Sequence, residues 1–508
     1  MILDAPHRVE PGKPIPLLLL AKDADRFSCI LHHVSVTVKS NAIHPTTHDL
    51  LKEPITIDAK FFSKVFQLER PQTEGWVECD TEFEIEIHGR RRTYRNDNYR
   101  TSSHRPLKIF LAATPLPALP GLHLGDAHLH SSFTDDQVEF GAPLKPSVEL
   151  ARSMGLSFFC VTDHSYDLDD RTDGFLHNDP ALPKWRELQN QIDALNEANP
   201  NFAVIRGEEV SCRNAFGHNV HFLLYGHRNF IPGSGDSAER WFKTWSEHSI
   251  AEILANNVDG TAAYASHALE PISFLQRLFL DRSTWTDSDL ALHGLTGMQF
   301  ANGKRETGFR RGYEAWVKFL LKGKKLFTLA GTDAHGNFNR YRQILIPFFK
   351  IQESHDQLFG KMQTGIFCSQ LTETAVVQSL LTGAAIATDG PVINLRVRND
   401  SNPTSIGKTF RSDSAATRSV AIDLSVRSTP EFGGLATVQV FYGVLGAPSE
   451  SLLAEFSEAQ EFALNKIIQL HIDAISYVRA EIHTSPAGTR DSTSHFCFSN
   501  PIWFVPRA

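Results

Sequence analysis

Cysteine is scarce in this chain, and its spacing argues against several kinds of site. The six cysteines lie at positions 29, 79, 160, 212, 368 and 497, and no two of them form a Cys-x-x-Cys pair. A disulfide framework and a thiolate zinc site are therefore not expected, because both need closely spaced or regularly patterned cysteines. The pattern is typical of a reducing compartment, and we expect a cytoplasmic protein.

Long hydrophobic runs are also missing. The strongest candidate, IPLLLLA at residues 15–21, is far shorter than the roughly 20 residues that a membrane-spanning helix needs and is typical of a buried strand. We see no basic segment followed by a long apolar one, so no signal peptide is predicted. The sequence therefore predicts a protein without a membrane partner.

An excess of positive charge is absent too. The net charge of the 508 residues is −8, which argues against a large basic surface and against a nucleic-acid polymer as partner. The densest basic run is HGRRRTYRNDNYR at residues 88–100, with Tyr94 and Tyr99 among its arginines. Such a run could bind a single strand, but its place between two alternating segments favours a charged hairpin.

Composition divides the chain into three predicted domains. Residues 1–118 contain alternating runs such as EFEIEIHG, which indicate an N-terminal β-sandwich-like domain. Residues 122–394 alternate short apolar runs with helical patterns, which favours a parallel sheet with crossover helices. Residues 395–508 return to alternation and predict a C-terminal β domain, and the Pro-rich segment TPLPALPG at 114–121 is typical of a linker.

Polar side chains of similar chemistry lie at or near the ends of most predicted strands in the central region. They are His128-x-His130 with Asp135, His164, Glu208-Glu209, His218 and His221, His267, and Asp333-x-His335. In a β/α barrel the active site lies where the strands end, and residues i and i+2 of a strand point the same way. Imidazole and carboxylate ligands suit zinc, manganese or iron. The pattern predicts two or three divalent metal ions, with Glu208 competing with Glu209, and His218 with His221, for one role each.

These motifs resemble those of a known family. GDAHLHSSFTD, GLSFFCVTDHS, RGEEVS, VHFLLYG, ASHALEP and LAGTDAHG are similar, in kind and in order, to the motifs of the PHP family, named for polymerase and histidinol phosphatase. The resemblance covers residues 122 to about 390 and implies a distorted seven-stranded (β/α) barrel of PHP type, flanked by N- and C-terminal all-β domains. It implies metal ligands at His128, His130, Asp135, His164, Glu209, His221, His267, Asp333 and His335. The sequence departs from the family in the fifth motif, where HALEP replaces the usual His-Pro and leaves the loop after His267 unassigned.

The predicted function is that of a metal-dependent hydrolase. The resemblance implies a phosphoesterase that attacks a small phosphorylated substrate through a metal-bridging hydroxide, and no GxSxG nucleophile motif is present. The residues predicted to be catalytic are His128, His130, Asp135, His164, Glu209, His267, Asp333 and His335. Four basic residues after the sixth and seventh strands, Lys304, Arg305, Arg340 and Arg342, are predicted to bind the substrate, because cationic side chains match phosphate oxygens.

Two alternatives to a phosphoesterase stay open at this point. The same metal centre could hydrolyse a carboxyl ester, an amide or a carbamate. The chain could also be a non-catalytic binding protein that a metal site stabilises.

Overall fold

The computed structural model describes residues 1–98, 104–135, 141–237, 245–257, 260–340, 343–346, 349–352, 357–398, 404–411 and 419–506. The chain forms two compact units, each built from segments that are far apart in sequence. Unit 1 contains residues 1–115, 130–156 and 334–360, and unit 2 contains residues 116–129, 157–333 and 361–508. The three predicted domains are consecutive, whereas these units are interleaved, and the predicted boundaries stay a prediction.

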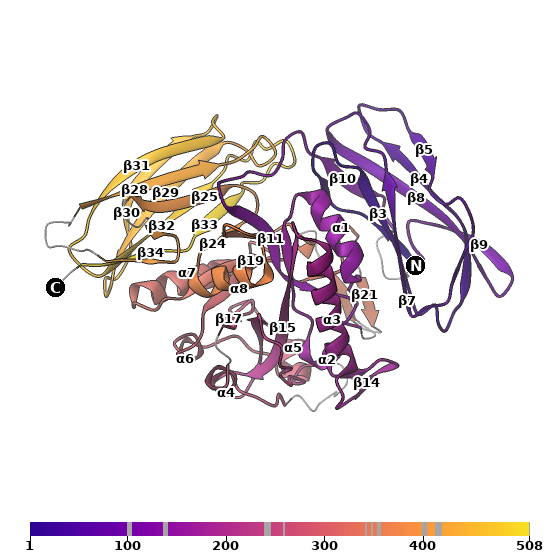
Figure 1. Cartoon of the computed structure of the whole chain (residues 1–508), viewed down its shortest axis with the longest axis horizontal. Helices are drawn as coiled ribbons and strands as arrows, with labels where there is room; N and C mark the ends of the chain where they lie inside the picture. Colours follow the sequence, from indigo (N-terminus) through magenta and orange to yellow (C-terminus); the bar gives the residue numbers. More distant parts are fainter. Residues whose placement is uncertain are drawn as a thin grey trace. The chain divides into compact units, whose positions relative to one another are not determined.

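Unit 1 is built on two β-sheets that share one apolar core. One sheet has the order β1-β3-β7, and the other has β2-β10-β8-β4-β5 with β6 paired to β4 and β9 paired to β8 (Figure 1). Alternation along the strands places Leu17 and Leu19 of β3 and Val34 and Val36 of β4 in the shared core. The bounds are β1 (Ile2–Asp4), β2 (Arg8–Val9), β3 (Ile15–Lys22), β4 (Cys29–Lys39), β5 (Thr46–Asp49), β6 (Ile55–Ile57), β7 (Phe61–Leu68), β8 (Gly75–Ile87), β9 (Arg90–Arg95), β10 (Leu107–Leu111), α1 (Leu144–Met154), β20 (Ala334–His335), β21 (Gln343–Ile346) and β22 (Phe349–Gln352).

Unit 2 is built around one long mixed sheet. Its strand order is β19-β18-β17-β16-β15-β12-β11-β23-β24-β33-β32-β29-β30. The part of this sheet from β19 to β11 contains β11 (Leu122–His130), β12 (Phe158–Val161), β15 (Ala203–Arg213), β16 (Asn219–Tyr225), β17 (Ala262–Ala265), β18 (Gly297–Asn302) and β19 (Phe327–Gly331). A separate hairpin is formed by β13 (Asp170–Arg171) and β14 (Gly174–Asn178).

The C-terminal strands extend this sheet and form a second one beside it. The extension contains β23 (Gln363–Phe367), β24 (Ala385–Thr388), β27 (Thr409–Arg411), β29 (Leu435–Val444), β30 (Ser451–Glu458), β32 (Ser476–His483), β33 (Phe496–Ser499) and β34 (Ile502–Val505). The second sheet has the order β26-β25-β28-β31, with β25 (Val392–Arg398), β26 (Thr404–Ser405), β28 (Ser419–Arg427) and β31 (Ala463–His471).

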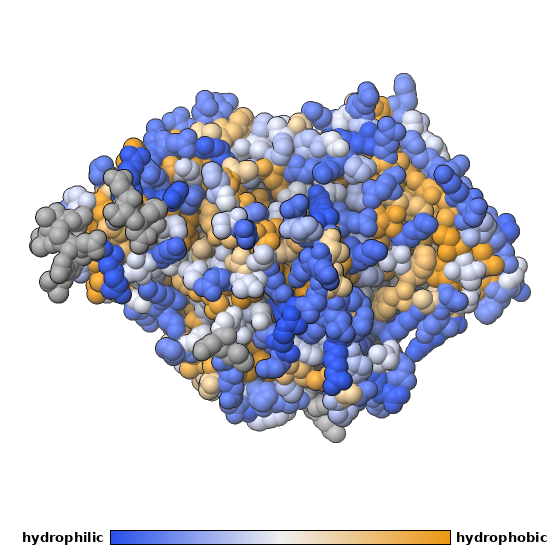
Figure 2. Space-filling view, viewed as in Figure 1, coloured by the Kyte–Doolittle hydropathy of each residue, from blue (hydrophilic) through white to orange (hydrophobic). Residues whose placement is uncertain are grey.

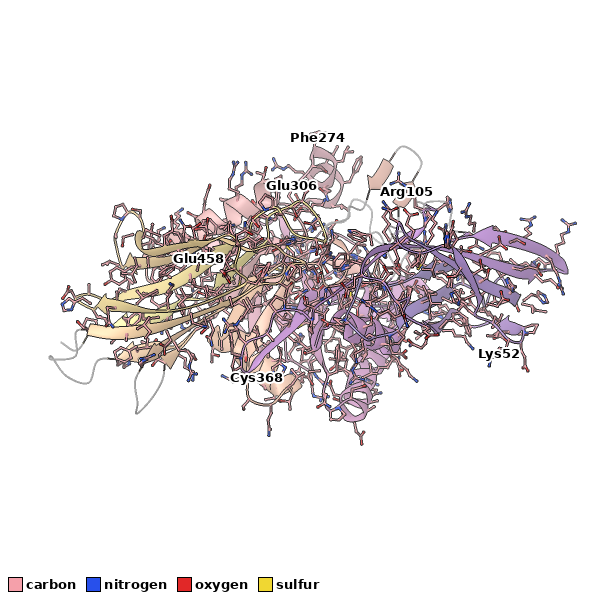
Figure 3. The ribbon with its side chains drawn as sticks, turned by 90° about the horizontal axis from the view of Figure 1, so that it is seen from above. Lys52, Arg105, Phe274, Glu306, Cys368 and Glu458 are labelled. Atoms are coloured by element: carbon pink, nitrogen blue, oxygen red, sulfur yellow. The ribbon has the colours of Figure 1, made fainter. Side chains whose placement is uncertain are left out.

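In the described residues of unit 2, seven helices connect or flank the strands. They are α2 (Ser165–Leu168), α3 (Pro183–Ala198), α4 (Ile250–Ala255), α5 (Phe274–Leu280), α6 (Asp287–Leu290), α7 (Thr307–Leu321) and α8 (Glu373–Thr382). The amphipathic helix α7 buries Trp316, Phe319 and Leu320 in the core. By contrast, α5 buries none of its residues, and Phe274 at its start projects away from the ribbon (Figure 3).

The predicted (β/α) barrel of PHP type with flanking all-β domains is wrong. Within the described residues the order of the strands does not close on itself. Beyond β11 the same sheet continues through β23 and β24 into the C-terminal strands, so these strands do not form a separate flanking domain. The pairs β15–β16 and β16–β17 are also antiparallel. Only residues 214–218 join β15 to β16, and a link this short allows a hairpin, because a parallel crossover needs about a dozen residues or more.

The surface carries both polar and apolar residues. On the face drawn in Figure 2, hydrophilic and hydrophobic residues are interspersed, and hydrophobic residues reach the surface of unit 1 where Figure 1 labels β8 and β9. Within the described residues, no helix combines the length and the apolar character that crossing a membrane requires.

Candidate metal centre

The carboxylate of Glu209 lies at the centre of a buried histidine cluster in unit 2. Its Oε1 atom is 3.1 Å from His221 Nδ1 and 3.3 Å from His267 Nε2. Its Oε2 atom is 3.2 Å from His164 Nδ1 and 3.4 Å from His128 Nε2. The side chains of Glu209 and His128 are completely buried, and Ser266 Oγ donates a 2.7 Å hydrogen bond to Oε1. Each carboxylate oxygen therefore faces its own pair of imidazole nitrogens.

A second carboxylate joins the cluster on the side of His128. Asp333 Oδ1 is 3.4 Å from His128 Nε2. Gln299 Oε1 lies 2.9 Å from the other ring nitrogen of His128, Gln299 donates to Asn302, and Asn302 donates to Asp333. Because an amide oxygen can only accept, the Nδ1 atom of His128 carries the proton and Nε2 is directed at the carboxylates. Burial lowers the pKa of His128, but Glu209 and Asp333 outweigh that effect and raise it to about 9.

His221 is oriented by a network that the sequence did not reveal. Its Nε2 atom donates to Asp236 Oδ2 at 2.7 Å, and Asp236 in turn accepts from Ser211 and faces Arg282 Nε at 3.3 Å. Burial raises the pKa of Asp236, but His221 and Arg282 lower it well below its usual range. The Nδ1 atom of His221 is thus left facing Glu209, with Arg282 Nη2 3.2 Å away.

The strand arrangement explains why these side chains meet. Glu209 and Ser211 are two residues apart on β15 and so point to the same face, and His221 of β16 is directly opposite Ser211 in the antiparallel register. His164 forms a bridge with Glu209 just after β12. His221 lies near the start of β16, yet it reaches the end of β15 because the two strands run in opposite directions.

The backbone is strained at two members of the cluster. His267 has φ 28° and Asp333 has φ 55°, which is the left-handed region that side-chain-bearing residues rarely adopt. Such strain tends to occur at functional sites. Beside Asp333, Gly331 lets β19 approach β11 closely, because a Cβ atom at this position would lie 2.6 Å from the Cβ of His128.

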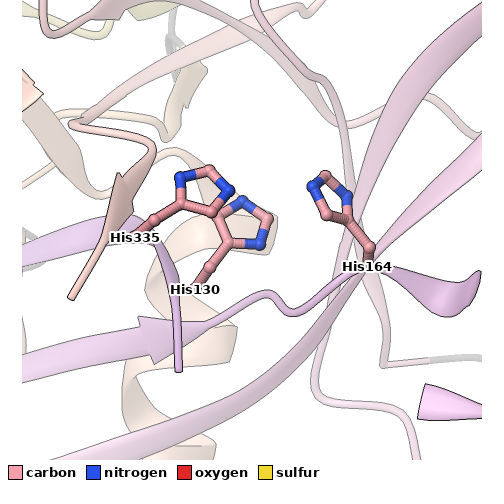
Figure 4. Close-up of side chains that lie close together, drawn as sticks. All are labelled: His130, His164 and His335. Carbon is pink, nitrogen blue, oxygen red and sulfur yellow. The ribbon is translucent and has the colours of Figure 1, made fainter. Parts of the chain in front are cut away.

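Three of the predicted ligands belong to unit 1. The rings of His130 and His335 are stacked with their centroids 4.1 Å apart, and Figure 4 shows their two rings face to face. Asp135 forms ion pairs with Lys22 and Lys60, both at 2.6 Å. Burial raises the pKa of Asp135, but the two ammonium groups lower it overall. Metal binding by these three residues stays a prediction.

In unit 2 the structure places the two residues of each competing pair, His218 and His221 and also Glu208 and Glu209, in different surroundings. His218 is about half exposed and forms a 2.7 Å ion pair with Asp281, whereas His221 lies in the cluster. Glu208 points to the opposite face of β15 from Glu209, where it accepts from the backbone N–H of Ile231 at 3.4 Å. Burial raises the pKa of Glu208 well above its usual range.

The four residues predicted to bind substrate have varied surroundings. Arg340 is buried in unit 1, where it donates to the backbone oxygens of Leu3 and Arg105. Arg305 donates to the backbone of Ser494 and lies over the ring of Phe496. Lys304 lines a small pocket with His267, and Arg342 lies outside the described residues. Substrate binding by these residues stays a prediction, and the contacts of Arg340 give it a structural role.

Asp236, Gln299 and Arg282 were missed from the sequence. Gln299 did leave a signal, because it is a polar residue inside the apolar run GMQFAN of β18 and is completely buried. Asp236 and Arg282 lie in irregular segments whose surroundings carry no periodic pattern.

Comparisons with known proteins identify no family. No family model matches the chain, and no curated protein sequence matches it. Among solved structures, a glycosyl hydrolase family 2 member from Bacteroides cellulosilyticus has a TM-score of 0.18 at 10% identity, covering 100% of this chain and 63% of that one. A Bacteroides uniformis β-glucuronidase has a TM-score of 0.17 at 7% identity, with coverages of 100% and 61%. A β-D-mannosidase from Dictyoglomus thermophilum has a TM-score of 0.22 at 6% identity, with coverages of 99% and 66%.

These scores are too low to support a shared fold, and the chain spans less than two thirds of the length of the first of these structures. The assignment to the PHP family is wrong, because no family model matches the chain and the described strands do not form the barrel that it implied. The phosphoesterase activity inferred from that resemblance is withdrawn with it.

Proposed function

We propose that the Glu209 cluster of unit 2 binds divalent metal ions and that the protein is a metal-dependent hydrolase. The observation that supports this proposal is the placement of four imidazole nitrogens 3.1–3.4 Å from the two oxygens of one buried carboxylate. Two ligands bound at 2.0–2.1 Å to one tetrahedral ion are about 3.3 Å apart. The separations in the cluster are those of ligands that share an ion.

The donor set fits zinc, manganese or iron. His164 and His221 with Glu209 would hold one ion, and His128 with Glu209 and Asp333 would hold a second, because the ligand atoms within each of these groups lie within 4.8 Å of one another. Imidazole and carboxylate are the ligands that these metals prefer. Arg282 pairs with Asp236 at 3.3 Å, whereas Glu209 and Asp333 face imidazoles. His130, Asp135 and His335 remain further candidates for a third ion.

The chain's own residues would tune such a centre. Gln299 holds the Nδ1 proton of His128, so that ring presents Nε2 to Glu209. Asp236 holds the Nε2 proton of His221, whose Nδ1 lies 3.1 Å from Glu209 and accepts from Arg282 at 3.2 Å, so Arg282 would have to give up this contact for His221 to bind a metal. When bound, the metal would supply the chemistry by lowering the pKa of a coordinated water from 15.7 to about 7. The substrates that we propose are carboxyl esters, amides or carbamates, whose carbonyl group a metal ion can polarise.

The test combines metal content with activity. Protein purified without chelator is measured by elemental analysis and assayed against carboxyl esters, amides, carbamates and phosphate esters, before and after metal removal. We expect at least two ions per chain and hydrolysis of one substrate class that metal removal abolishes. Two ions without hydrolysis of any class would instead support a metal-stabilised binding protein, and fewer than one ion after reloading would refute the metal centre.

A further inference from the structure

The arginines of β9 in unit 1 divide between the two faces of the strand. Arg91 donates to Glu84 at 3.2 Å and to Glu86 at 3.3 Å, and Arg95 pairs with Asp80. Arg90 and Arg92 lie on the opposite face because side chains alternate along a strand. In the described part of the chain, no hydrogen bond or ion pair joins either of these two guanidinium groups to another side chain. One face of the hairpin is therefore neutralised, and the other keeps two positive charges.

The positive face also carries a fixed aromatic ring. Tyr94 lies opposite Phe83 in the β8–β9 register, and the two rings are stacked with centroids 5.7 Å apart and an interplanar angle of 26°. Phe83 is completely buried, whereas Tyr94 is only partly buried. One face of the Tyr94 ring is thus held against Phe83, and the partly buried side chain also lines a pocket.

Arg90, Arg92 and Tyr94 line one pocket with Ile85, Ile87 and His88. Its volume of about 390 Å³ lies within the range of small-molecule sites. The pocket is preorganised by a two-residue turn in which His88 and Gly89 have φ 51° and 72°, the geometry of the tightest β-hairpins. Neighbouring side chains on this face, Arg90 to Arg92 and Arg92 to Tyr94, are roughly 6.7 Å apart along the strand.

We propose that this pocket binds a nucleoside phosphate, with the base stacked on Tyr94 and the phosphate held by Arg90 and Arg92. A planar guanidinium pairs with two phosphate oxygens at once, and an aromatic side chain stacks with a base of any sequence. The apolar floor of Ile85 and Ile87 favours a ligand with a ring over a bare anion. The overall charge of −8 disfavours binding of long polymers, whereas Arg90 and Arg92 supply a local positive charge at the pocket.

The ligand could come from two sources, a free nucleotide or a nucleotide within a single strand. The probes are AMP, measured by calorimetry, and a fluorescein-labelled oligonucleotide of eight thymidines, measured by anisotropy. Competition of AMP with the oligonucleotide would identify the free nucleotide as a ligand of the pocket. Binding of the oligonucleotide alone would identify the single strand.

Two double variants with equal charge change test the site. Arg90→Gln with Arg92→Gln should weaken binding at least tenfold, whereas Arg91→Gln with Arg95→Gln, on the neutralised face, should weaken it less than threefold. Tyr94→Leu should weaken AMP binding without changing the binding of tripolyphosphate, which has no ring. Circular dichroism shows whether each variant is folded.

Equal losses in the two double variants would overturn the proposal, because they would mean that only net charge matters. Absence of binding by the wild-type chain to both nucleotide probes at low salt would overturn it as well. Neither outcome depends on the metal centre of unit 2, whose metal content is measured separately.

Discussion

Two buried charged clusters of unit 2 differ in how tightly their groups approach one another. Around Arg479, the guanidinium donates to Glu450 Oε1 at 2.7 Å and to Tyr313 at 2.9 Å, and Tyr313 donates to Glu481 at 2.6 Å. Around Glu209, the four nitrogen–oxygen separations are 3.1–3.4 Å. Charge-assisted hydrogen bonds prefer 2.7–2.9 Å, so the first cluster is closed by its own hydrogen bonds and the second is spaced for ions.

The Arg479 cluster stabilises the fold by its own ion pairs, whereas the Glu209 cluster has the groups that a metal ion needs. Arg479 is a permanent cation whose side chain is completely buried between two carboxylates, so its pairing is complete without a ligand. The Glu209 cluster contains mainly imidazoles, which can give up a proton and accept a metal ion. Burial alone therefore does not identify a functional site, and the identity and spacing of the groups do.

The largest effect should follow the loss of the central carboxylate. Glu209→Gln removes the one group that faces all four imidazoles, so metal content should fall below one ion per chain and hydrolysis by at least about 10³-fold, or roughly 4 kcal/mol in barrier height. Elemental analysis and initial rates measure both. Glu208→Gln is the matched control, since it makes the same change at the neighbouring residue on the opposite face, and it should keep its metal. Retention of metal by Glu209→Gln would refute the centre.

Breaking the Arg479 cluster should lower the free energy of unfolding and leave the metal content unchanged. Arg479→Met leaves Glu450 and Glu481 buried without their cation, which typically costs about 3–5 kcal/mol. Chemical denaturation should show this loss while the metal content of the folded fraction stays unchanged. Arg398→Met, which breaks an exposed pair with Asp423, should cost less than about 1 kcal/mol. A similar cost for both variants would show that burial is not what makes the Arg479 cluster matter.

A third charged cluster, around the buried His495, makes stability depend on pH. Burial lowers the pKa of His495, but Asp389 and Asp491 raise it to about 9. The unfolded value is near 6.5, so this contribution to stability is fully present below pH 6.5 and is lost as pH rises through 9. Its size is on the order of 3 kcal/mol. The stability difference between wild type and His495→Gln should shrink from pH 6 to pH 10, and a constant difference would contradict the protonated state.

Loss of the charge of Asp236, which accepts from His221 Nε2, should weaken metal binding without abolishing it. Asp236→Asn keeps a side-chain oxygen that can accept from His221 Nε2 but removes the charge, and changes in such partners typically cost 10–100-fold in affinity. Competition with a coloured chelator gives the affinity directly. Asp287→Asn, which breaks an exposed pair with Lys318 on α7, serves as a control for charge loss. An unchanged affinity in Asp236→Asn would show that Asp236 does not act through His221.

The sequence indicated which side chains lie together better than it indicated the fold that holds them. His128, His164, Glu209, His221, His267 and Asp333 were predicted as metal ligands, and the structure brings these six together, while metal binding by them stays a prediction. The barrel was wrong because alternating strands and helices were taken as parallel throughout, although the five-residue link before β16 requires a hairpin. Sequence patterns report which face a side chain occupies, but pairing between distant strands depends on contacts that no local pattern contains.

The smallest effect concerns His218, which competed with His221 for one role in the sequence, where the resemblance favoured His221. His218 lies at the surface in an ion pair with Asp281, and both side chains are more than one third exposed, so His218→Gln should cost less than about 1 kcal/mol of stability. Its hydrolytic rate should change less than about tenfold, the equivalent of 1.4 kcal/mol in barrier height. His221→Gln should lower both metal content and rate far more, because it removes a nitrogen 3.1 Å from Glu209. Both variants make the same change, at His218 in the exposed link between β15 and β16 and at His221 in the buried cluster. The reverse ranking would mean that the register placing His221 opposite Ser211 is shifted by an odd number of residues.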